Sequence, residues 1–528
     1  MTDSILFWNA VALEANRVSH SDPDKREQNG PTLSSRALAI VHLAMYDAYA
    51  GVESNAATFP RYLPVPPPPP PGASHRDAVA GAAFTTLSRL FRTQIDFFES
   101  QLSCFDMSNP SYKFGVKVGE ALLDKRANDP DARDCGYQVS PARGRHRVDP
   151  DNPGQGFHAP FYGAQSKGFA ISVRHALGAP PFDNAEYVTA LKQVRAKGMM
   201  PELMGTMPNS LFSNKRTAEE SVIGIYWAYD GANRLGTPPR LYNQIIRLVA
   251  AKQNNSEGDN ARLFAFVNVA MGDAGILAWE QKYCHDLWRP VVGIREHDTS
   301  CGPAARNPQD AANAIDDNAD PFWLPLGAPN TNTLLKNVTP NFPAYPSGHA
   351  TFGAAAFHIT RLFYGIKKGD RKADKLFDNL AFVSEELNGG NRDNKGAVRP
   401  RHVRNFKGGL WDMIIENATS RILLGVHWIF DAFALKGDKP DLSRNIGGVP
   451  LGLDIAEDIF GFGGGKAPKM TPEGTANPPI TTPEPKSPMP TVPAQPASVK
   501  GCANTRGKKG AGEPEMVKDE FPSGTSPR

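Results

Sequence analysis

Three short segments in the second half of the chain carry charged and hydrogen-bonding side chains in otherwise apolar surroundings. The first segment contains Lys282 and Arg289, and Arg289 is followed directly by Pro290. Helical residues seven apart lie two turns apart on one face, and a residue before proline is disfavoured inside a helix. We therefore expect both cations on one helix face, with Arg289 at the helix end. Taken alone, a Lys/Arg pair at this spacing is more typical of a solvated face.

The second segment, Pro-Ser-Gly-His at 346–349, is typical of a loop that enters a helix. Ser347 stands at the expected N-cap, where free backbone N–H groups and a partial positive charge favour a bound anion. Gly348 lets a ligand approach the backbone closely. His349 then falls in the first turn, beside that anion. The alternative for this segment is a capped helix with an incidental histidine.

The third segment places Arg421 and His427 in an apolar stretch that ends near Asp431. Asp431 follows His427 by four residues, so on a helix it could hold the imidazole in one tautomer and leave the other nitrogen free. A buried Arg421 requires an anionic partner. Taken alone, such a histidine is also common as a hydrogen-bonded core residue.

Together the three segments indicate one binding site. Lys282, Arg289 and Arg421 would repel one another unless a polyanion lay between them. Guanidinium groups match the oxygens of tetrahedral or trigonal-bipyramidal oxyanions, and the donors at Ser347 and Gly348 would add to them. Phosphate and vanadate are therefore the expected ligands.

The elements that position these residues are predicted to be helices. Apolar residues recur at three- and four-residue spacing over many stretches, whereas two-residue alternation is rare, so strands should be few. This pattern is typical of a mainly α fold built of helical bundles. The expected helices cover 34–51, 77–103, 112–128, 217–230, 240–252, 258–283, 348–364, 371–388, 408–424 and 425–436.

The chain is long enough for more than one hydrophobic core. We expect two helical lobes, 1–215 with long loops and 216–462 with the oxyanion site. Residues 463–528 are rich in proline and poor in large apolar side chains, so a flexible tail is expected there.

Composition excludes several classes of protein. The formal net charge is only +3, from 58 basic and 55 acidic residues, which argues against nucleic-acid binding. The five cysteines form no CxxC pair, so neither a zinc site nor a disulfide framework is indicated. No apolar run long enough for a membrane span is evident, and the N-terminus lacks the basic region of a signal peptide.

The motifs resemble those of a known superfamily. In the order K-x6-R-P, P-S-G-H and S-R-x5-H-x3-D, they are shared by vanadium haloperoxidases and related acid phosphatases. The wider chain is similar to fungal-type vanadium chloroperoxidases. The stretches that carry this likeness are ILFWNAVALEANRV at 5–18, IYWAYDGANRLGTPPRLYNQI at 225–245, DAGILAWEQ at 273–281, FPAYPSGHATFG at 342–353, SEELNGGNRD at 384–393 and SRILLGVHWIFDA at 420–432.

This resemblance implies one vanadate per chain, with hydrogen peroxide and halide ions as substrates. His427 would bind the vanadium through Nε2. The oxygens would accept hydrogen bonds from the residues of the cation cage and the helix start: Lys282, Arg289, Ser347, Gly348 and Arg421. His349 would be the acid–base residue, and Lys282 would also polarise an oxygen of the bound peroxide.

Three more residues match the family outside the motifs. Asp230 corresponds to a carboxylate that pairs with Arg421, and Trp279 and Phe342 correspond to aromatic residues beside the halide path. The bromide-preferring algal branch has histidine where this chain has Phe342. The resemblance therefore favours oxidation of chloride, as well as bromide and iodide, to hypohalous acid.

Two alternatives to this function remain open. One is a soluble acid phosphatase with His427 as phosphorylated nucleophile and His349 as general acid. The other is a non-catalytic oxyanion-binding relative. We expect a monomer with no membrane span and no nucleic-acid partner. The resemblance implies secretion without a classical signal peptide, and the cytoplasm is the alternative location.

Overall fold

The chain folds into α-helices joined by long loops, which confirms the mainly α prediction. The computed structural model describes residues 3–133, 136–156, 158–205, 214–297, 301–303, 305 and 319–475. Within these residues the helices are α1 (Ser4–Ser19), α2 (Gly30–Val52), α3 (His75–Leu90), α4 (Ile95–Ser100), α5 (Pro110–Lys125), α6 (Tyr162–Gln165), α7 (Ala185–Lys197), α8 (Pro201–Met204), α9 (Ala218–Tyr226), α10 (Pro238–Lys252), α11 (Glu257–His285), α12 (Pro290–Arg295), α13 (Gly348–Phe363), α14 (Gly409–Leu423), α15 (Ile429–Ala432) and α16 (Gly448–Phe462), with 3₁₀ turns η1 (Pro23–Lys25), η2 (Arg92–Gln94) and η3 (Glu385–Leu387).

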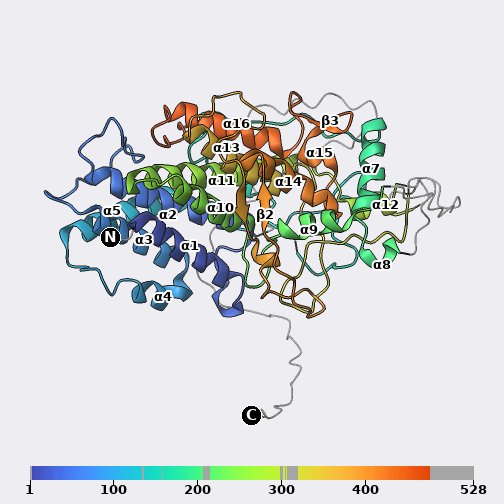
Figure 1. Ribbon diagram of the computed structural model, residues 1–528, viewed down its shortest axis with the longest axis horizontal. Coiled ribbons are helices and arrows are strands. Elements are labelled where there is room, and N and C mark those ends of the chain that lie inside the picture. The colour runs from blue at the N-terminus through green and yellow to red at the C-terminus, as the bar shows by residue number, and fades with distance from the viewer. Residues whose placement is uncertain are drawn as a thin grey trace, which may run out of the picture. The chain divides into compact units, whose positions relative to one another are not determined.

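Helix α11 is the long central element of the described part. It begins with a capping box in which Ser256 and Asp259 each bond the other's backbone N–H. Its sides contact α2, α10, α13 and α16, and Figure 1 shows it running among them. By length and hydropathy α11 could cross a membrane, but 94% of the relevant window is buried within the protein. Such burial is typical of a core helix.

The N-terminal helices α2, α3 and α5 pack on one another and, through α2, on α11. Small residues bring α3 and α5 unusually close. A Cβ added at Gly81 would lie 2.1 Å from the carbonyl oxygen of Tyr112, and one at Gly115 would lie 1.9 Å from that of Ala78. Larger residues at either glycine would force the two helices apart.

Helix α13 is the centre of the second group of helices. It packs against α11, α14 and α16, and nearly all of its residues are buried. Lys282 in the last turns of α11, His349 in the first turn of α13 and Arg421 near the end of α14 are all buried. The ends of three helices therefore supply three of the residues that the motifs singled out.

The predicted helix at 371–388 is wrong. That segment instead contains turns, strand β1 (Leu380–Phe382) and η3, and β1 pairs antiparallel with β2 (Arg404–Phe406). Leu380 and Phe382 are buried while Ala381 between them is exposed, which is the two-residue period of a strand. Asn379 has a left-handed φ of 57°, which interrupts a right-handed helix.

The predicted helix at 425–436 is also mostly wrong. Gly425 has a φ of +75° and follows the end of α14, a position that favours glycine. Only α15 is helical in this stretch, and it is followed by β3 (Ala434–Lys436), which pairs with β4 (Lys439–Asp441). His427 thus lies in the short link between α14 and α15.

The first part of the expected flexible tail is packed against the protein. Arg262 donates hydrogen bonds to the carbonyl oxygens of Gly465 (2.9 Å) and Lys466 (2.7 Å), and Ala467 is buried. The N–H of Thr471 donates to the carbonyl oxygen of Phe169 at 3.1 Å. The predicted tail boundary at 463 is therefore too early, and the rest of that prediction, from 476 onward, lies outside the described residues.

The division into lobes at 215/216 stays a prediction, and residues 206–213 beside it lie outside the described residues. Within the stretch expected to be long loops, α7 forms a regular helix. Its N-cap is Asn184, whose side chain accepts a hydrogen bond from the N–H of Tyr187.

Candidate active site

Lys282 is held in the interior by backbone carbonyl groups. Its Nζ donates to the carbonyl oxygens of Pro343 (2.9 Å), Ala344 (3.1 Å) and Pro346. These three bonds engage all three N–H groups of the ammonium. Burial, followed by the nearby charge of Arg289, holds the pKa of Lys282 well below its usual value. Lys282 therefore reaches a bound oxygen only by exchanging one carbonyl partner.

Arg289 does not lie on the helix of Lys282, so the prediction of one shared helix face is wrong. Asp286 adopts a left-handed conformation (φ 52°) after α11, and Arg289 becomes the N-cap of α12. The two cations still approach the same place, because the Arg289 Nε donates to the carbonyl oxygen of Phe342 at 2.7 Å. Its Nη1 donates to the carbonyl oxygen of Val426 (2.8 Å) and to His427 Nε2 (2.9 Å). Burial lowers the pKa of Arg289 to about 9.

His427 is fixed in one tautomer by its two neighbours. Its Nδ1 lies 2.7 Å from the Asp431 Oδ2, as the spacing predicted, although Asp431 reaches it from α15 rather than from a shared helix. Because a guanidinium can only donate, the Nε2 that faces Arg289 carries a lone pair and Nδ1 carries the proton. The ring therefore presents a nucleophilic or metal-binding nitrogen to the cations. Burial raises the pKa of Asp431 to about 7.

Arg421 is buried and pairs with Asp230, as the resemblance implied. Its Nη2 donates to the Asp230 Oδ1 at 2.8 Å. The Nε and Nη1 of Arg421 and the Oδ2 of Asp230 are buried and have no hydrogen-bond partner among the described residues. Buried donors of this kind are costly unless a ligand accepts from them.

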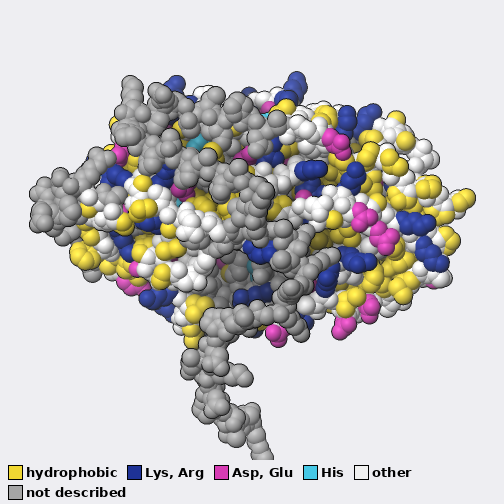
Figure 2. All heavy atoms as spheres, turned by 180° about the vertical axis from the view of Figure 1, so that it is seen from behind, with side chains coloured by type: hydrophobic (Ala, Val, Ile, Leu, Met, Phe, Trp, Pro, Cys, Tyr) yellow, Lys and Arg dark blue, Asp and Glu magenta, His cyan; other side chains and the backbone are white. Residues whose placement is uncertain are grey.

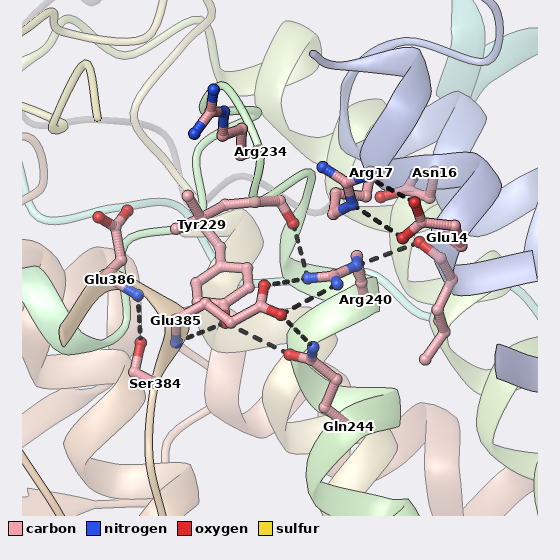
Figure 3. Close-up of polar contacts among 12 residues, drawn as sticks. Glu14, Asn16, Arg17, Tyr229, Arg234, Arg240, Gln244, Ser384, Glu385 and Glu386 are labelled. Carbon is pink, nitrogen blue, oxygen red and sulfur yellow. Dashed lines mark hydrogen bonds and ion pairs between the residues drawn. The ribbon is translucent and has the colours of Figure 1, made fainter. Parts of the chain in front are cut away.

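The turn that carries Asp230 is anchored by a network of polar side chains (Figure 3). The hydroxyl of Tyr229 donates to the Gln244 Oε1 at 3.3 Å and accepts from the N–H of Glu385 at 2.9 Å. Arg240 donates to the carbonyl oxygen of Leu235 at 3.0 Å and forms an ion pair with Glu385. This network fixes the turn that delivers Asp230 to the site.

Ser347 and His349 occupy the positions at the start of α13 that the sequence predicted. Ser347 is the N-cap, and its hydroxyl accepts from the N–H of Ala350. The His349 Nε2 lies 2.6 Å from the carbonyl oxygen of Ala228 and 3.9 Å from the Asp230 Oδ1. Since a carbonyl only accepts, Nε2 is protonated and Nδ1 can accept a proton. Burial, followed by the charge of Arg421, holds the pKa of His349 well below its usual value.

A cavity of about 270 Å³ opens onto these residues. Trp279 and Phe342 form an aromatic wall, with ring centroids 4.9 Å apart. Lys282 Nζ lies 5.1 Å from the Phe342 centroid, so the cations lie directly behind this wall. The lining includes Asp230, Trp279, Phe342, Gly348, His349, Arg421 and His427 among the residues that the sequence singled out.

Sequence reasoning missed His158, which lines the same cavity. It stands in a stretch rich in glycine and proline and read only as loop, so no local pattern marked it. The sequence reasoning also missed the anchoring role of Glu385, although Glu385 lies within one of the stretches that carried the family likeness. Both residues act through partners distant in the sequence.

The chemistry of the donor set points to an oxyanion. Three buried cations meet at one place, and among the residues described the Nη2 of Arg289 has no hydrogen-bond partner, like the Nε and Nη1 of Arg421. In the part of the chain that the structure describes, no cluster of three His, Cys, Asp or Glu side chains offers a cage for a bare metal ion. Fold and site together define a helical-bundle protein that binds an oxyanion beside a histidine nitrogen.

Comparison with known proteins identifies the family. The model of the vanadium chloroperoxidase N-terminal domain matches residues 1–168, and that of the VCPO second helical-bundle domain matches 262–447. A vanadium chloroperoxidase of Curvularia inaequalis is 36% identical, over 88% of this chain and 90% of the relative. The chain belongs to the vanadium chloroperoxidase family, within the vanadium-dependent haloperoxidases.

Solved structures support the fold. A bacterial vanadium-dependent iodoperoxidase aligns with a TM-score of 0.57 at 18% identity, over 88% of this chain and 97% of that chain. The holo form of a bacterial vanadium-dependent chloroperoxidase aligns with a TM-score of 0.54 at 16% identity, over 86% and 96%. These two structures share the helical architecture with this chain.

Proposed function

We propose that this protein uses hydrogen peroxide to oxidise halide to hypohalous acid with vanadate as its cofactor. The observation that carries the proposal is the His427 Nε2 lone pair, which faces Arg289. Beside it lie buried N–H groups of Arg289 and Arg421 that have no partner within the part of the chain that the structure describes. A metal held in an oxyanion needs one ligand nitrogen and several donors to its oxygens, and this arrangement supplies both.

The described residues fit vanadate, the cofactor of the family, with one bound per chain. His427 would hold the vanadium. Its oxygens would accept hydrogen bonds from Lys282, Arg289, Ser347, the Gly348 N–H and Arg421. The Ser347 oxygen accepts from the N–H of Ala350, and its hydroxyl hydrogen can at the same time donate to the ligand. Bound vanadate supplies a Lewis acid that activates hydrogen peroxide.

The protein's own groups would handle charge and protons. The cations already lie around the site before any ligand arrives, so stabilising negative charge on the oxygens requires only that Lys282 and Arg289 exchange one hydrogen-bond partner each. His349 is neutral near pH 7, because its pKa is lowered, and its Nδ1 can accept a proton. Asp230 neutralises part of the charge of Arg421, and it lies 3.9 Å from His349.

Chloride is the proposed preferred halide, with bromide and iodide also oxidised. Phe342 lies with Trp279 against the cations, where the resemblance places the halide path. The Curvularia relative is named as a chloroperoxidase, whereas the structural relatives include both an iodoperoxidase and a chloroperoxidase. The proposal of chloride as the preferred halide is therefore supported by Phe342 and by the Curvularia relative.

A halogenation assay tests this function. The purified protein is supplied with hydrogen peroxide and monochlorodimedone, with chloride, bromide or iodide, and with or without vanadate. We expect halide-dependent bleaching only when vanadate is present. Bleaching with iodide alone would reject the chloride assignment, and no bleaching with any halide would reject the peroxidase function.

A phosphatase is the second candidate, because a histidine lone pair among cations could also attack a phosphoryl group. The same preparation is assayed with p-nitrophenyl phosphate. A phosphatase would hydrolyse it without vanadate and would be inhibited by vanadate, whereas the proposed enzyme is activated by vanadate in the halide assay. A protein inert in both assays but able to bind vanadate would be a non-catalytic relative.

A further inference from the structure

His158 lines the cavity and has no role in the site described above. Its ring centroid lies 5.9 Å from that of Trp279, at an interplanar angle of 81°, and 6.0 Å from that of Phe342. The three rings therefore form one continuous wall. Ring edges carry partial positive charge, so an edge-to-face arrangement can present favourable surface to an anion.

The backbone of His158 is tied to two elements of the site. Its carbonyl oxygen accepts from Trp279 Nε1 (3.3 Å) and from the hydroxyl of Tyr283 (2.6 Å), both on α11. Its N–H donates to the carbonyl oxygen of Asn341 at 3.4 Å, next to Phe342. The imidazole thus keeps a fixed position relative to both other rings.

The side chain of His158 fits against the start of α2. Its Nε2 lies 3.3 Å from the Thr32 Oγ1. A Cβ at Gly30 would lie 2.3 Å from the imidazole Cε1, and Gly30 has a φ of +73°. Any other residue at 30 would therefore be strained and would displace the imidazole. A glycine at this point keeps room for His158 on the cavity wall.

We propose that His158 is a specificity-determining residue that selects the anion entering between its own ring, Trp279 and Phe342. The inference rests on the proposed function and deepens it. A polar imidazole offers a small, strongly hydrated halide a partner that a purely apolar wall lacks. His158 therefore favours chloride over iodide.

Acidity strengthens this preference. Burial, followed by the charge of His20, lowers the pKa of His158 to about 4. The imidazole is neutral at pH 7 and gains positive charge as the pH falls toward 4. Two titratable groups act on it directly, His20 from the end of α1 and Tyr283 from α11. Asp230, His349 and Arg421 line the same cavity. The added charge raises anion affinity at low pH.

Steady-state kinetics of the full-length, vanadate-loaded protein test the inference. His158→Phe keeps an aromatic ring and removes both nitrogens, His158→Gln keeps a polar group, and His402→Phe replaces a histidine that does not line the cavity. At pH 4.5 we expect His158→Phe to lower the ratio of kcat/KM for chloride to that for iodide about tenfold, the effect of one lost charge-assisted contact. The loss should be smaller at pH 7 and partly restored in His158→Gln.

The control variant His402→Phe should keep the wild-type ratio of kcat/KM for chloride to that for iodide. The KM for hydrogen peroxide should be the same in all variants. An unchanged halide ratio in both His158 variants overturns the inference. A changed KM for the organic acceptor with an unchanged halide ratio also overturns it, because the residue would then select the acceptor. If circular dichroism shows that His158→Phe does not fold, His158→Gln and Thr32→Val test the inference instead. In each we expect a smaller fall in the chloride-to-iodide ratio of kcat/KM.

Anion uptake is also measured without vanadate or turnover. Iodide quenches tryptophan fluorescence on contact, and Trp279 lines the cavity, so quenching that disappears in Trp279→Phe reports iodide in the cavity. At pH 4.5 this quenching should require several-fold more iodide in His158→Phe than in the wild type. Equal quenching in the two proteins contradicts the inference. A wild type that shows this quenching but no halide-dependent turnover rejects the proposed function and leaves the anion-selecting role of His158 supported.

Discussion

Arg289 donates a hydrogen bond to His427 Nε2 across 2.9 Å, while Asp431 holds the opposite ring nitrogen at 2.7 Å. The nitrogen assigned to vanadium therefore faces a cationic donor. Once His427 Nε2 held a metal, Arg289 would lose this partner and its guanidinium could donate to the oxygens of the ligand instead. The contact both fixes the tautomer and holds Arg289 ready beside the ligand.

Replacing His427 with Ala should abolish tight vanadate binding, because the nitrogen that bonds the metal is lost. We expect the Kd for vanadate to rise at least about 100-fold, or about 2.7 kcal/mol. Isothermal titration with vanadate measures it, and circular dichroism confirms the fold. Tight binding that survives in this variant would refute the assignment of His427.

Replacing His349 with Ala should leave vanadate bound and slow turnover. Loss of a positioned acid–base group typically lowers kcat by about 10²- to 10⁴-fold. Titration and steady-state kinetics on the same preparation separate the two effects. A variant with normal kcat would remove His349 from the proton-transfer role.

Replacing Asp431 with Asn should weaken vanadate binding through His427. The amide can still accept from the imidazole Nδ1–H but no longer supports it with a negative charge, and loss of such a partner costs about 10- to 100-fold in affinity. Asp431→Ala should bind vanadate more weakly still, because the imidazole of His427 then also loses the contact that orients it. Equal affinities for the wild type and both variants would show that Asp431 serves only the packing of α15.

Anion affinity should fall as the pH rises above about 9. The pKa of Arg289 is lowered to about 9, so this guanidinium is charged below that pH and loses its proton above it. An oxyanion binds the charged form, so affinity is highest below pH 9 and is lost on the alkaline side. Sulfate is a suitable probe because its own charge is constant there. Arg289→Gln should bind sulfate weakly and with a smaller pH dependence, which would come from Lys282, whose pKa is also lowered. A wild type with flat affinity would contradict the assignment.

Replacing Glu385 with Gln should disturb the turn that carries Asp230. The buried Arg240 would lose the charge of its partner, which we expect to cost about 1–2 kcal/mol of unfolding free energy. Urea unfolding measures this loss. Because the disturbed turn carries Asp230, which orients Arg421, we also expect a lower kcat at pH 7 with saturating vanadate. This fall should be larger than the loss of folded protein accounts for. A stability loss with unchanged kcat would limit Glu385 to a structural role.

The sequence anticipated the residues of the site better than the backbone that delivers them. Ser347 caps its helix as the Pro-Ser-Gly-His pattern predicted, and Asp431 bonds His427 as the spacing predicted. The helix expected to reach Arg289 ends earlier, at the left-handed residue Asp286, and the helix expected at 425–436 does not form around His427, because the left-handed Gly425 follows the end of α14. An aspartate in that conformation carries no reliable local signal, because tertiary contacts select it.

His158 could not be found from its neighbours in sequence. Its partners Thr32, Trp279 and Tyr283 lie more than 100 residues away, and only the folded chain brings them together. Glu385 is similar, since its contacts with Tyr229 and Arg240 join a 3₁₀ turn to a helix far earlier in the chain. Periodicity and motif spacing report local structure and leave such contacts unmarked.

The packed segment after α16 determines where the chain can be shortened. A protein ending at residue 475 keeps every contact described for this region, including those of Arg262 with Gly465 and Lys466. A protein ending at Phe462 loses these contacts and exposes the surface that Ala467 covers. It also lacks the hydrogen bond from the Thr471 N–H to the carbonyl oxygen of Phe169. Affinity tags and fusion partners are therefore best joined beyond 475.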